Sequence, residues 1–343
     1  MAFEVRASEG KAGDRSGTIY ELTDAASTVR AEVWPQWGFN CLKWQVRQPD
    51  GHWADILFHM PDWESNPVPT RSGQPILFPF PGRLRDGRFT FEGKTYQLPL
   101  NESSKLHAIH GFTPRNRWRV TGHDCGDAHA ALTGAFNLAK DFPEALPWWP
   151  SDFEFQVTYR LSADRLRVDA RVENVGAAPL PFGLGYHGYF VLPGANAADV
   201  SDYVLQAGTG ALWEAENNLP TGRKIGLPPE LDFRAPRPVG STALDNVFAE
   251  AHGPVDPQSG LTEVATLSHP NAVGRLRVLA DTSFRDLVLF TPAHRHAVAI
   301  EPYSCSADAS NLQAKGADSG WRVLPVGGVW ESAVEYRYEP AVV

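Results

Sequence analysis

Hydrophobic and polar residues alternate along much of the chain. In the segments 153–161 and 165–172 every second side chain is apolar, and the residues between them are mostly charged or polar. This period of two is typical of a β-strand that buries one face. Only residues 162–164 separate the two segments, so the pattern predicts an antiparallel hairpin.

Similar patterns recur over the whole length. Residues 89–91 and 95–98 flank Glu92-Gly93 and predict a second hairpin. Further strands are expected at 18–23, 28–34, 40–47, 53–58, 129–136, 202–206, 263–268, 273–280, 286–291, 296–301 and 330–338. Helical periodicity is confined to 137–145 and 306–315, each long enough for a turn or two. Because so many strands would curl or split a single sheet, we expect two large antiparallel sheets packed face to face.

Composition supports an all-β protein. The 343 residues include 30 glycines and 28 prolines, a content that favours many short strands joined by turns over a helical bundle. No change in composition marks a linker and no repeat of fixed period appears, so we predict one domain over residues 1–343. The proline-rich segments 61–81 and 219–238 are expected to be surface loops.

Charge and cysteine content narrow the choice of partners and location. The net charge is −9, which argues against nucleic acid or an anionic membrane surface, since both are bound largely through an excess of basic residues. Cys41, Cys125 and Cys305 are far apart in sequence, so neither a disulfide framework nor a cysteine metal site is indicated. With no apolar run typical of a signal peptide or a membrane span, we expect a cytoplasmic protein with reduced thiols.

Most histidine-bearing polar clusters lie beside glycine and proline, where loops on a rigid sheet commonly build ligand sites. Glu301 follows the apolar strand residues Val298-Ala299-Ile300, and a buried carboxylate must be paired, protonated or used in chemistry. An ion pair with Arg83 is the structural alternative. His187, which aromatic residues flank, would by itself be assigned to the core or to a turn.

Two other features have simple structural explanations. His294 and His296 could share a strand face as metal ligands, but Pro292 precedes them and no third ligand lies nearby in sequence, so a hairpin tip is expected. Trp148 and Trp149 could stack on a sugar or pack against the edge of the sheet. Neither feature enters the predicted site, and no metal is expected.

Five motifs taken together resemble a known family. In order they are PFPGRLRDGRFTFEGKTYQLPLNE (79–102), LHAIHGFTPRNRW (106–118), LGYHGYFVLPG (184–194), LDNVF (244–248) and AIEPYS (299–304). From about Gln74 to the C-terminus the chain is similar to the aldose 1-epimerases, also called galactose mutarotases. Five motifs in the expected order are far more specific than any one of them. The resemblance implies an antiparallel β-supersandwich with a sugar-binding cleft.

The resemblance also implies roles for individual residues. Glu301 matches the catalytic base of the family and His187 its catalytic acid, while Arg83 and Asp245 match residues that bind sugar hydroxyls. No metal, nucleotide or redox cofactor is implied, and no phosphate-binding or dinucleotide-binding glycine motif is present.

The histidine of the second motif has two candidates. His107 has the spacing to Trp118 found in galactose-type members, whereas His110, directly before Gly111-Phe112, fits relatives with a shorter motif. Both are retained as substrate-binding candidates, with a preference for His110.

Two departures from the family pattern bear on the substrate. Gly82 stands where many members have asparagine before the arginine, and residues 184–186 replace the Thr-Asn segment that usually precedes the acid histidine. These departures leave the acid–base pair intact and weaken the expectation of a preference for galactose.

The chemistry implied is the interconversion of the α and β anomers of a hexose or related aldose. Opening the ring requires a base at the anomeric hydroxyl and an acid at the ring oxygen, so Glu301 is expected ionised and His187 protonated, about one pyranose apart at opposite edges of the sugar. The partner is a small sugar, and the chain is expected to be a monomer or a homodimer.

Other functions remain as alternatives. A hexose-6-phosphate 1-epimerase would need a basic pocket to which Arg85 or Arg88 could contribute. A non-catalytic carbohydrate-binding protein of the same fold would need neither acid nor base. A glycosidase with Glu301 and Asp245 as its two carboxylates would leave the histidine motifs unexplained.

Overall fold

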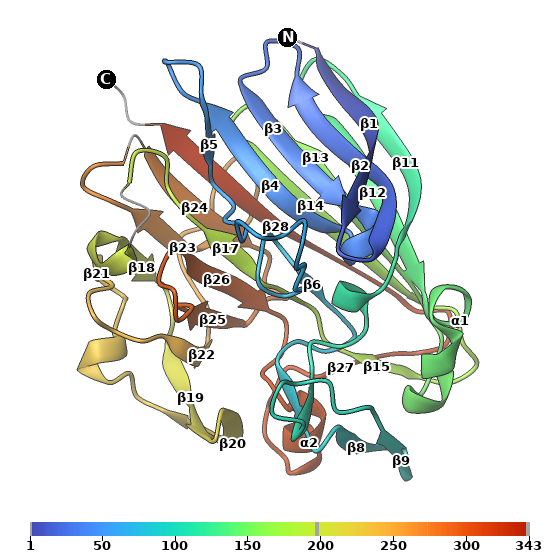
Figure 1. Cartoon of the computed structure of the whole chain (residues 1–343). Coiled ribbons are helices and arrows are strands. Elements are labelled where there is room, and N and C mark those ends of the chain that lie inside the picture. The colour runs from blue at the N-terminus through green and yellow to red at the C-terminus, as the bar shows by residue number, and fades with distance from the viewer. Residues whose placement is uncertain (1, 196–198, 273, 341–343) are drawn as a thin grey trace.

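Three large antiparallel sheets build the protein (Figure 1). The computed structural model describes residues 2–195, 199–272 and 274–340. The largest sheet has nine strands, in the order β11 (Arg119–Cys125), β12 (Ala130–Asn137), β13 (Phe153–Leu161), β14 (Arg165–Asn174), β28 (Val329–Pro340), β24 (Gly274–Ala280), β23 (Thr262–Ser268), β18 (Val204–Ala207) and β21 (Arg237–Pro238).

Two smaller sheets form the opposing layer. One has eight strands: β20 (Leu219–Ile225), β19 (Ala211–Glu216), β22 (Asp245–Ala249), β25 (Asp286–Phe290), β26 (Val298–Tyr303), β16 (Gly185–Tyr186) and β6 (Ile76–Leu77), with β17 (Gly188–Phe190) also on β26. The other has five: β1 (Phe3–Ala12), β2 (Arg15–Asp24), β3 (Val29–Trp34), β4 (Asn40–Arg47) and β5 (Trp53–Asp55). Bridges between Leu57 and Phe190 and between Cys41 and Gln74 connect them.

Short ribbons and helices complete the chain. The two-stranded ribbons are β7 (Arg83–Arg85) with β10 (His107–Ile109), β8 (Arg88–Phe91) with β9 (Lys94–Gln97), and β15 (Leu180–Phe182) with β27 (Arg322–Leu324). The α-helices are α1 (Leu138–Asp141) and α2 (Ala309–Ala314), and the 3₁₀ turns are Pro35–Trp37, Thr113–Arg115, Pro143–Trp148, Val200–Asp202 and Pro229–Leu231. None of these helices is long and apolar enough to cross a membrane.

The main core lies between the nine-stranded sheet and the two smaller sheets. Tyr159 of the large sheet contacts Phe39 beside the five-stranded sheet, with ring centroids 5.5 Å apart. Tyr336, on the same face of the large sheet, packs against Phe190 of the eight-stranded sheet at 5.1 Å. All four side chains are fully buried. One face of the large sheet thus holds both smaller sheets in place, and it fixes the eight-stranded sheet that carries the cleft described below.

The predicted fold class is confirmed. The hairpin expected from the alternation at 153–172 is β13–β14, in which apolar and half-buried residues alternate without interruption. The two helical segments are α1 with its following 3₁₀ turn, and α2, both short as expected. The strand expected at 273–280 is β24, except that residue 273 lies outside the described residues.

Several strands were not predicted. Most residues of β1 and all residues of β11 are partly or fully exposed. Only the first half of β1 alternates between apolar and polar residues, and the sequence of β11 shows no such alternation. Both form edge strands of their sheets, where side chains face solvent in either direction. Backbone pairing with a neighbour, rather than an apolar face, determines that these segments are extended.

The prediction of two surface loops was partly wrong. Residues 72–80 are buried, and Phe78 stacks on Phe155 with ring centroids 4.3 Å apart. Residues 219–225 form β20. Proline and glycine correctly marked changes of direction, but they do not show whether the turn lies at the surface, because that depends on which elements pack above it.

Phe155 offers a test of this packing. Replacing it with alanine removes a fully buried ring that contacts both Phe78 and Trp118. We expect Phe155→Ala to lower the free energy of unfolding by about 3–5 kcal/mol. Gln156→Ala, a half-buried neighbour on the opposite face of β13, should change it by less than about 0.5 kcal/mol. Urea unfolding measures both values, and equal effects would contradict the assignment of faces.

Candidate functional site

A cavity of about 650 Å³ lies over one face of the eight-stranded sheet. Val247, Val288 and Glu301 are direct neighbours across strands β22, β25 and β26, and all three line it. Asp245 and Phe290 form part of the next row, two residues away, and line it as well. Because side chains two apart on a strand share a face, the register alone collects these residues on one wall.

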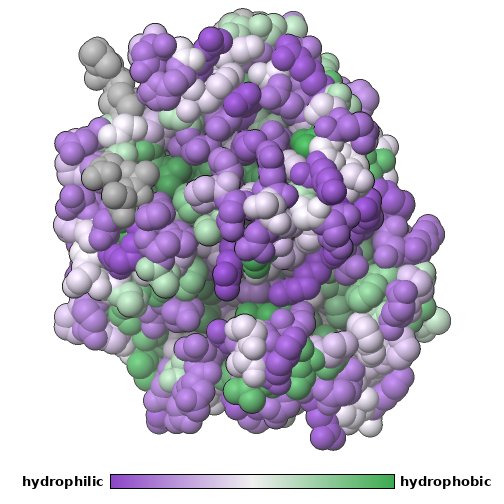
Figure 2. Space-filling model, in the orientation of Figure 1, coloured by the Kyte–Doolittle hydropathy of each residue, from purple (hydrophilic) through white to green (hydrophobic). Residues whose placement is uncertain are grey.

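The opposite face of the same strands belongs to the main core. Ile300, Leu289 and Phe248 are fully buried there. The sheet is thus apolar on one side and carries the polar cavity on the other. Hydrophilic residues cover most of the molecular face seen in Figure 2, and hydrophobic ones are visible in the depth of its central hollow.

Glu301 and His187 meet at the floor of the cavity. The Nε2 atom of His187 lies 3.4 Å from Oε1 of Glu301, and the two side chains are 9% and 1% exposed. The expectation that they stand about one pyranose apart, at opposite edges of a sugar, is therefore corrected. The reason is register: Gly188 pairs with Ile300, so the preceding and following residues are adjacent across the same two strands.

Burial acts against the charge states expected for the pair. Burial raises the pKa of Glu301 well above its ordinary value, although the hydroxyl of Tyr303 donates a hydrogen bond to Oε2 at 2.9 Å. Burial lowers the pKa of His187 to about 3. Desolvation disfavours the charged form of each group and shifts both toward their neutral forms, because little water surrounds either one.

Two tyrosines missed in the sequence support the pair. Tyr303 lies two residues after Glu301, and Tyr189 lies two residues after His187. The ring of Tyr189 stacks on the imidazole with centroids 4.6 Å apart, and its hydroxyl donates to the carbonyl oxygen of Thr70 at 2.8 Å. The spacing of two, which places side chains on one strand face, is the signal that could have identified both tyrosines.

His110 joins the pair from a tight turn. Its backbone has a φ of 62°, a conformation that is uncommon outside glycine and that clusters at functional sites. Nδ1 accepts a hydrogen bond from the backbone N–H of Gly82 at 3.2 Å, so the proton of the neutral ring resides on Nε2. The ring stands edge-on to His187, with centroids 5.6 Å apart. Burial and the neighbouring His187 lower the pKa of His110 well below its ordinary value.

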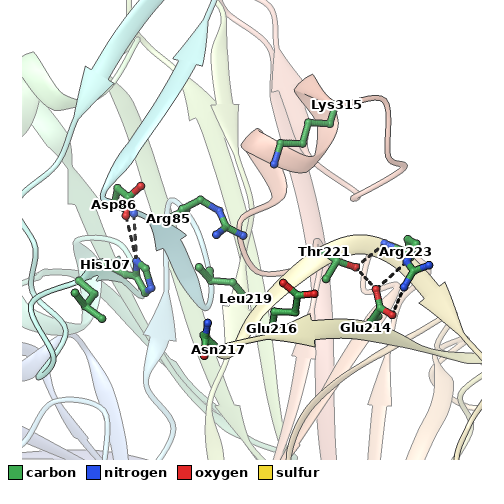
Figure 3. A pocket seen from close by; sticks show the side chains of 11 residues that line it. Arg85, Asp86, His107, Glu214, Glu216, Asn217, Leu219, Thr221, Arg223 and Lys315 are labelled. Carbon is green, nitrogen blue, oxygen red and sulfur yellow. Dashed lines mark hydrogen bonds and ion pairs between the residues drawn. The ribbon is translucent and has the colours of Figure 1, made fainter.

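The structure places His107 elsewhere. It belongs to a second hollow of about 870 Å³, lined mainly by polar residues of the β19–β20 hairpin together with Arg85, Asp86 and Lys315 (Figure 3). There the Nδ1 atom of His107 accepts from the backbone N–H of Asp86 at 3.2 Å. Of the two histidines in the motif, His110 is therefore the one that lines the cavity with Glu301.

Arg83 enters the cavity from β7, but it is not the partner of Glu301. Its Nε donates to Oε1 of Glu102 at 2.5 Å, and Ser104 donates to the other carboxylate oxygen at 2.6 Å. Burial raises the pKa of Glu102, but the hydrogen bonds from Ser104 and Arg83 outweigh it and lower that pKa. Glu102 was not singled out in the sequence because it lies in a loop whose position is set only by folding.

Asp245, the first residue of β22, lines the same cavity. Its side chain is accessible from the cavity, yet protein surrounds the carboxyl group closely enough that desolvation raises its pKa, with Arg83 acting in the opposite direction. Glu301, His187, His110, Arg83 and Asp245 thus line one cavity, as the family resemblance implied.

The remaining candidate residues, Trp149, His294 and His296, do not lie beside Glu301 and His187 on the floor of the cavity. Trp149 is buried against Phe80 and Phe89, which supports the packing interpretation. His294 lies at the cavity rim, where it and His296 pack around Phe58. Within the part of the chain that the structure describes, no group of three or more His, Cys, Asp or Glu side chains could hold a metal ion.

Comparisons with known proteins agree on one family. The model of the aldose 1-epimerase family matches residues 19–337. The galactose mutarotase of Mus musculus is 26% identical, covering 71% of this chain and 69% of its own. The uncharacterized protein YihR of Escherichia coli K12 is also 26% identical, covering 69% and 71%.

Solved structures share the fold. A galactose mutarotase-like protein from Clostridium acetobutylicum superposes with a TM-score of 0.84 at 22% identity, over 98% of this chain and 99% of its own. The galactose 1-epimerase of Lactobacillus acidophilus gives a TM-score of 0.74 at 18% identity, over 99% and 100%. At these sequence identities the structural similarity shows the architecture alone.

The protonation of His187 can be measured. Because its folded pKa is about 3, the ring should stay neutral when the pH is lowered from 8 to 5, as followed by the chemical shifts of its imidazole nitrogens. The unfolded chain would bind this proton near pH ~6.5, so the protein should lose stability progressively as the pH falls from that value toward the folded pKa of about 3. Protonation of His187 near pH ~6.5 in the folded protein would contradict the neutral pair.

Proposed function

Because the chain belongs to the aldose 1-epimerase family, whose members are isomerases, we propose that it interconverts the α and β anomers of a hexose or related aldose. The observation that supports this most directly is the 3.4 Å approach of His187 Nε2 to Glu301 Oε1 on the floor of the cavity. The hydroxyl and the ring oxygen that exchange protons in this reaction are bonded to the same anomeric carbon. An acid and a base in near contact fit two such oxygens.

Ring opening moves two protons and breaks one bond. Glu301 takes the proton of the anomeric hydroxyl, His187 gives its proton to the ring oxygen, and the bond between that oxygen and C1 breaks as the C1 carbonyl forms. Rotation about the C1–C2 bond then presents the other face of the carbonyl. Closure returns each proton along the same path, so the enzyme ends as it began.

One proton held by the pair is enough for this cycle. A protonated Glu301 beside a neutral His187 holds one titratable proton, as does an ionised Glu301 beside a protonated His187. Transfer of the proton across the 3.4 Å gap converts one arrangement into the other with no change in total charge. Sugar hydroxyls bound beside the pair would lower the cost of the charged arrangement, because they solvate it in place of water.

Three further residues would hold the sugar. Arg83 carries a fixed charge that Glu102 orients, and Asp245 offers an acceptor for hydroxyl groups. The neutral ring of His110 presents an Nε2–H donor beside His187. Donors fixed before binding stabilise charge that develops on the ring oxygen without further reorganisation.

The sugar-binding alternative, and the two arginines suggested for a phosphate pocket, receive less support. A protein that only binds sugars needs no buried acid–base pair, since hydroxyl recognition requires neither proton donor nor proton acceptor of matched strength. Arg85 pairs with Asp308 and lines the other hollow, and neither Arg85 nor Arg88 lines the cavity that contains Glu301. These two arginines therefore give no support to a phosphate pocket.

Glu301→Gln tests the proposed base. The variant keeps the shape of the side chain and removes its ability to exchange a proton, so kcat should fall by about 10²–10⁴-fold with little change in the temperature of unfolding. Anomer exchange of glucose and galactose, followed by proton NMR or polarimetry, measures the rate. The matched control is Glu331→Gln, an exposed carboxylate on β28, which should keep the parent rate.

An unchanged rate in Glu301→Gln would remove this residue from the mechanism. Absence of acceleration by the parent protein with any aldose would favour the sugar-binding alternative instead.

Glu102→Gln tests the orientation of Arg83. The variant weakens the charge-assisted bond that holds the guanidinium, so KM should rise by about 10-fold while kcat changes less. Steady-state rates over a range of aldose concentrations separate the two constants. A fall in kcat with KM unchanged would show that Glu102 does not act through substrate binding.

A further inference from the structure

A second guanidinium lines the cavity and has no carboxylate partner. Arg115 ends the 3₁₀ turn Thr113–Arg115 and is half-buried beside Asn101, Ser103 and His110. Among the described residues its side chain makes one hydrogen bond, from Nη1 to the carbonyl oxygen of Ile109 at 3.4 Å, and no ion pair. A guanidinium has five N–H donors, so most of its capacity is unused.

Removing this charge from water without a partner is costly. Desolvation lowers the pKa of Arg115, and no carboxylate opposes the shift. A positive charge held in this way by the folded protein is a preformed site for an anion that arrives with a ligand.

The two other arginines that line the cavity are either paired with a carboxylate or exposed to solvent. Arg83 is paired with Glu102. Arg71 has no ion pair in the described chain, but its side chain is exposed to solvent near His294 at the rim. Arg115 alone combines partial burial with the lack of an acidic partner.

The position of Arg115 relative to the acid–base pair indicates which part of a sugar it would meet. The ring of His110 lies 5.6 Å from that of His187, and the guanidinium contacts the peptide oxygen of Ile109, immediately before His110. His187 is the proposed donor to the ring oxygen. The ring oxygen joins C1 to C5, and C5 carries C6, so C6 projects on the far side of the ring oxygen from the anomeric centre.

We propose that Arg115 binds an anionic group on C6 of the sugar, and that the preferred substrates are hexoses that carry a phosphate, a sulfate ester or a carboxylate at this carbon. The inference rests on the proposed anomer interconversion and specifies its substrate class. It also accounts for the size of the cavity, since a volume of about 650 Å³ leaves room for a substituent beside a single pyranose.

The first experiment compares substrates in the unaltered protein. Exchange NMR at anomeric equilibrium gives kcat/KM for glucose, glucose 6-phosphate, glucose 6-sulfate and glucuronate, and the three anionic sugars distinguish which group is preferred. At least one anion should exceed glucose by about 10-fold or more, as expected for a charge-assisted hydrogen bond. A kcat/KM for glucose equal to or above all three would overturn the inference while leaving the proposed function intact.

The second experiment removes the charge. Arg115→Gln should lower the ratio of kcat/KM for the preferred anion to that for glucose by about 10- to 100-fold, mainly through KM, and Arg115→Lys should restore part of it. The matched control is Arg117→Gln, an exposed neighbour outside the cavity that donates to the carbonyl oxygen of Ser16 and should leave the ratio unchanged. A loss confined to Arg71→Gln would place the anion at the rim and overturn the assignment to Arg115.

Binding separates this inference from the proposed reaction. Isothermal titration of the whole protein with glucose and with glucose 6-phosphate, glucose 6-sulfate or glucuronate requires no turnover. Tighter binding of one anion, lost in Arg115→Gln, supports the site even if no anomer exchange is catalysed. Equal binding of all four sugars overturns it whatever the rate.

Discussion

The cavity depends on one constraint: a carboxyl group and an imidazole are held in near contact where water is almost excluded. Glu301 is on a central strand of the eight-stranded sheet, and His187 immediately precedes the strand paired with it. Pairing of Gly188 with Ile300 sets their separation, so backbone hydrogen bonds rather than side-chain preferences align the two groups. A slip of one residue would turn Glu301 into the apolar core.

Burial determines the chemistry of this pair. With little water to stabilise charge, the pKa of Glu301 is raised and that of His187 is lowered, so burial favours the neutral form of each group. Tyr303 fixes one carboxyl oxygen and Tyr189 stacks on the imidazole, so neither group can turn away to find another partner. The pair therefore retains a proton that it can redistribute internally, which suits a reaction in which the substrate gains and loses protons in equal number.

The walls of the cavity are formed by ribbons and loops outside the eight-stranded sheet. The β7–β10 ribbon brings Arg83 to the opening, and the turn after β10 brings His110 and Arg115. These segments pack over the cavity through loop contacts such as that between Arg83 and Glu102. They bring the positive charges of Arg83 and Arg115 to the cavity, although the net charge of the whole protein is −9. Local arrangement, and not overall composition, therefore sets the electrostatics that a ligand would meet.

The sequence by itself determined the all-β architecture, the β13–β14 hairpin and the identity of most candidate groups, because period-two alternation and short motifs are local properties of the chain. It did not predict the edge strands β1 and β11, in which most residues are exposed to solvent. Nor could it choose between His107 and His110, since both fit the motif.

Only the tertiary structure decided how far Glu301 lies from His187, which carboxylate holds Arg83, and that Arg115 has no such partner. The physical reason is that distance, desolvation and ion pairing depend on strand register and on loops folded from separate parts of the chain. Those relations exist only after the sheets have packed.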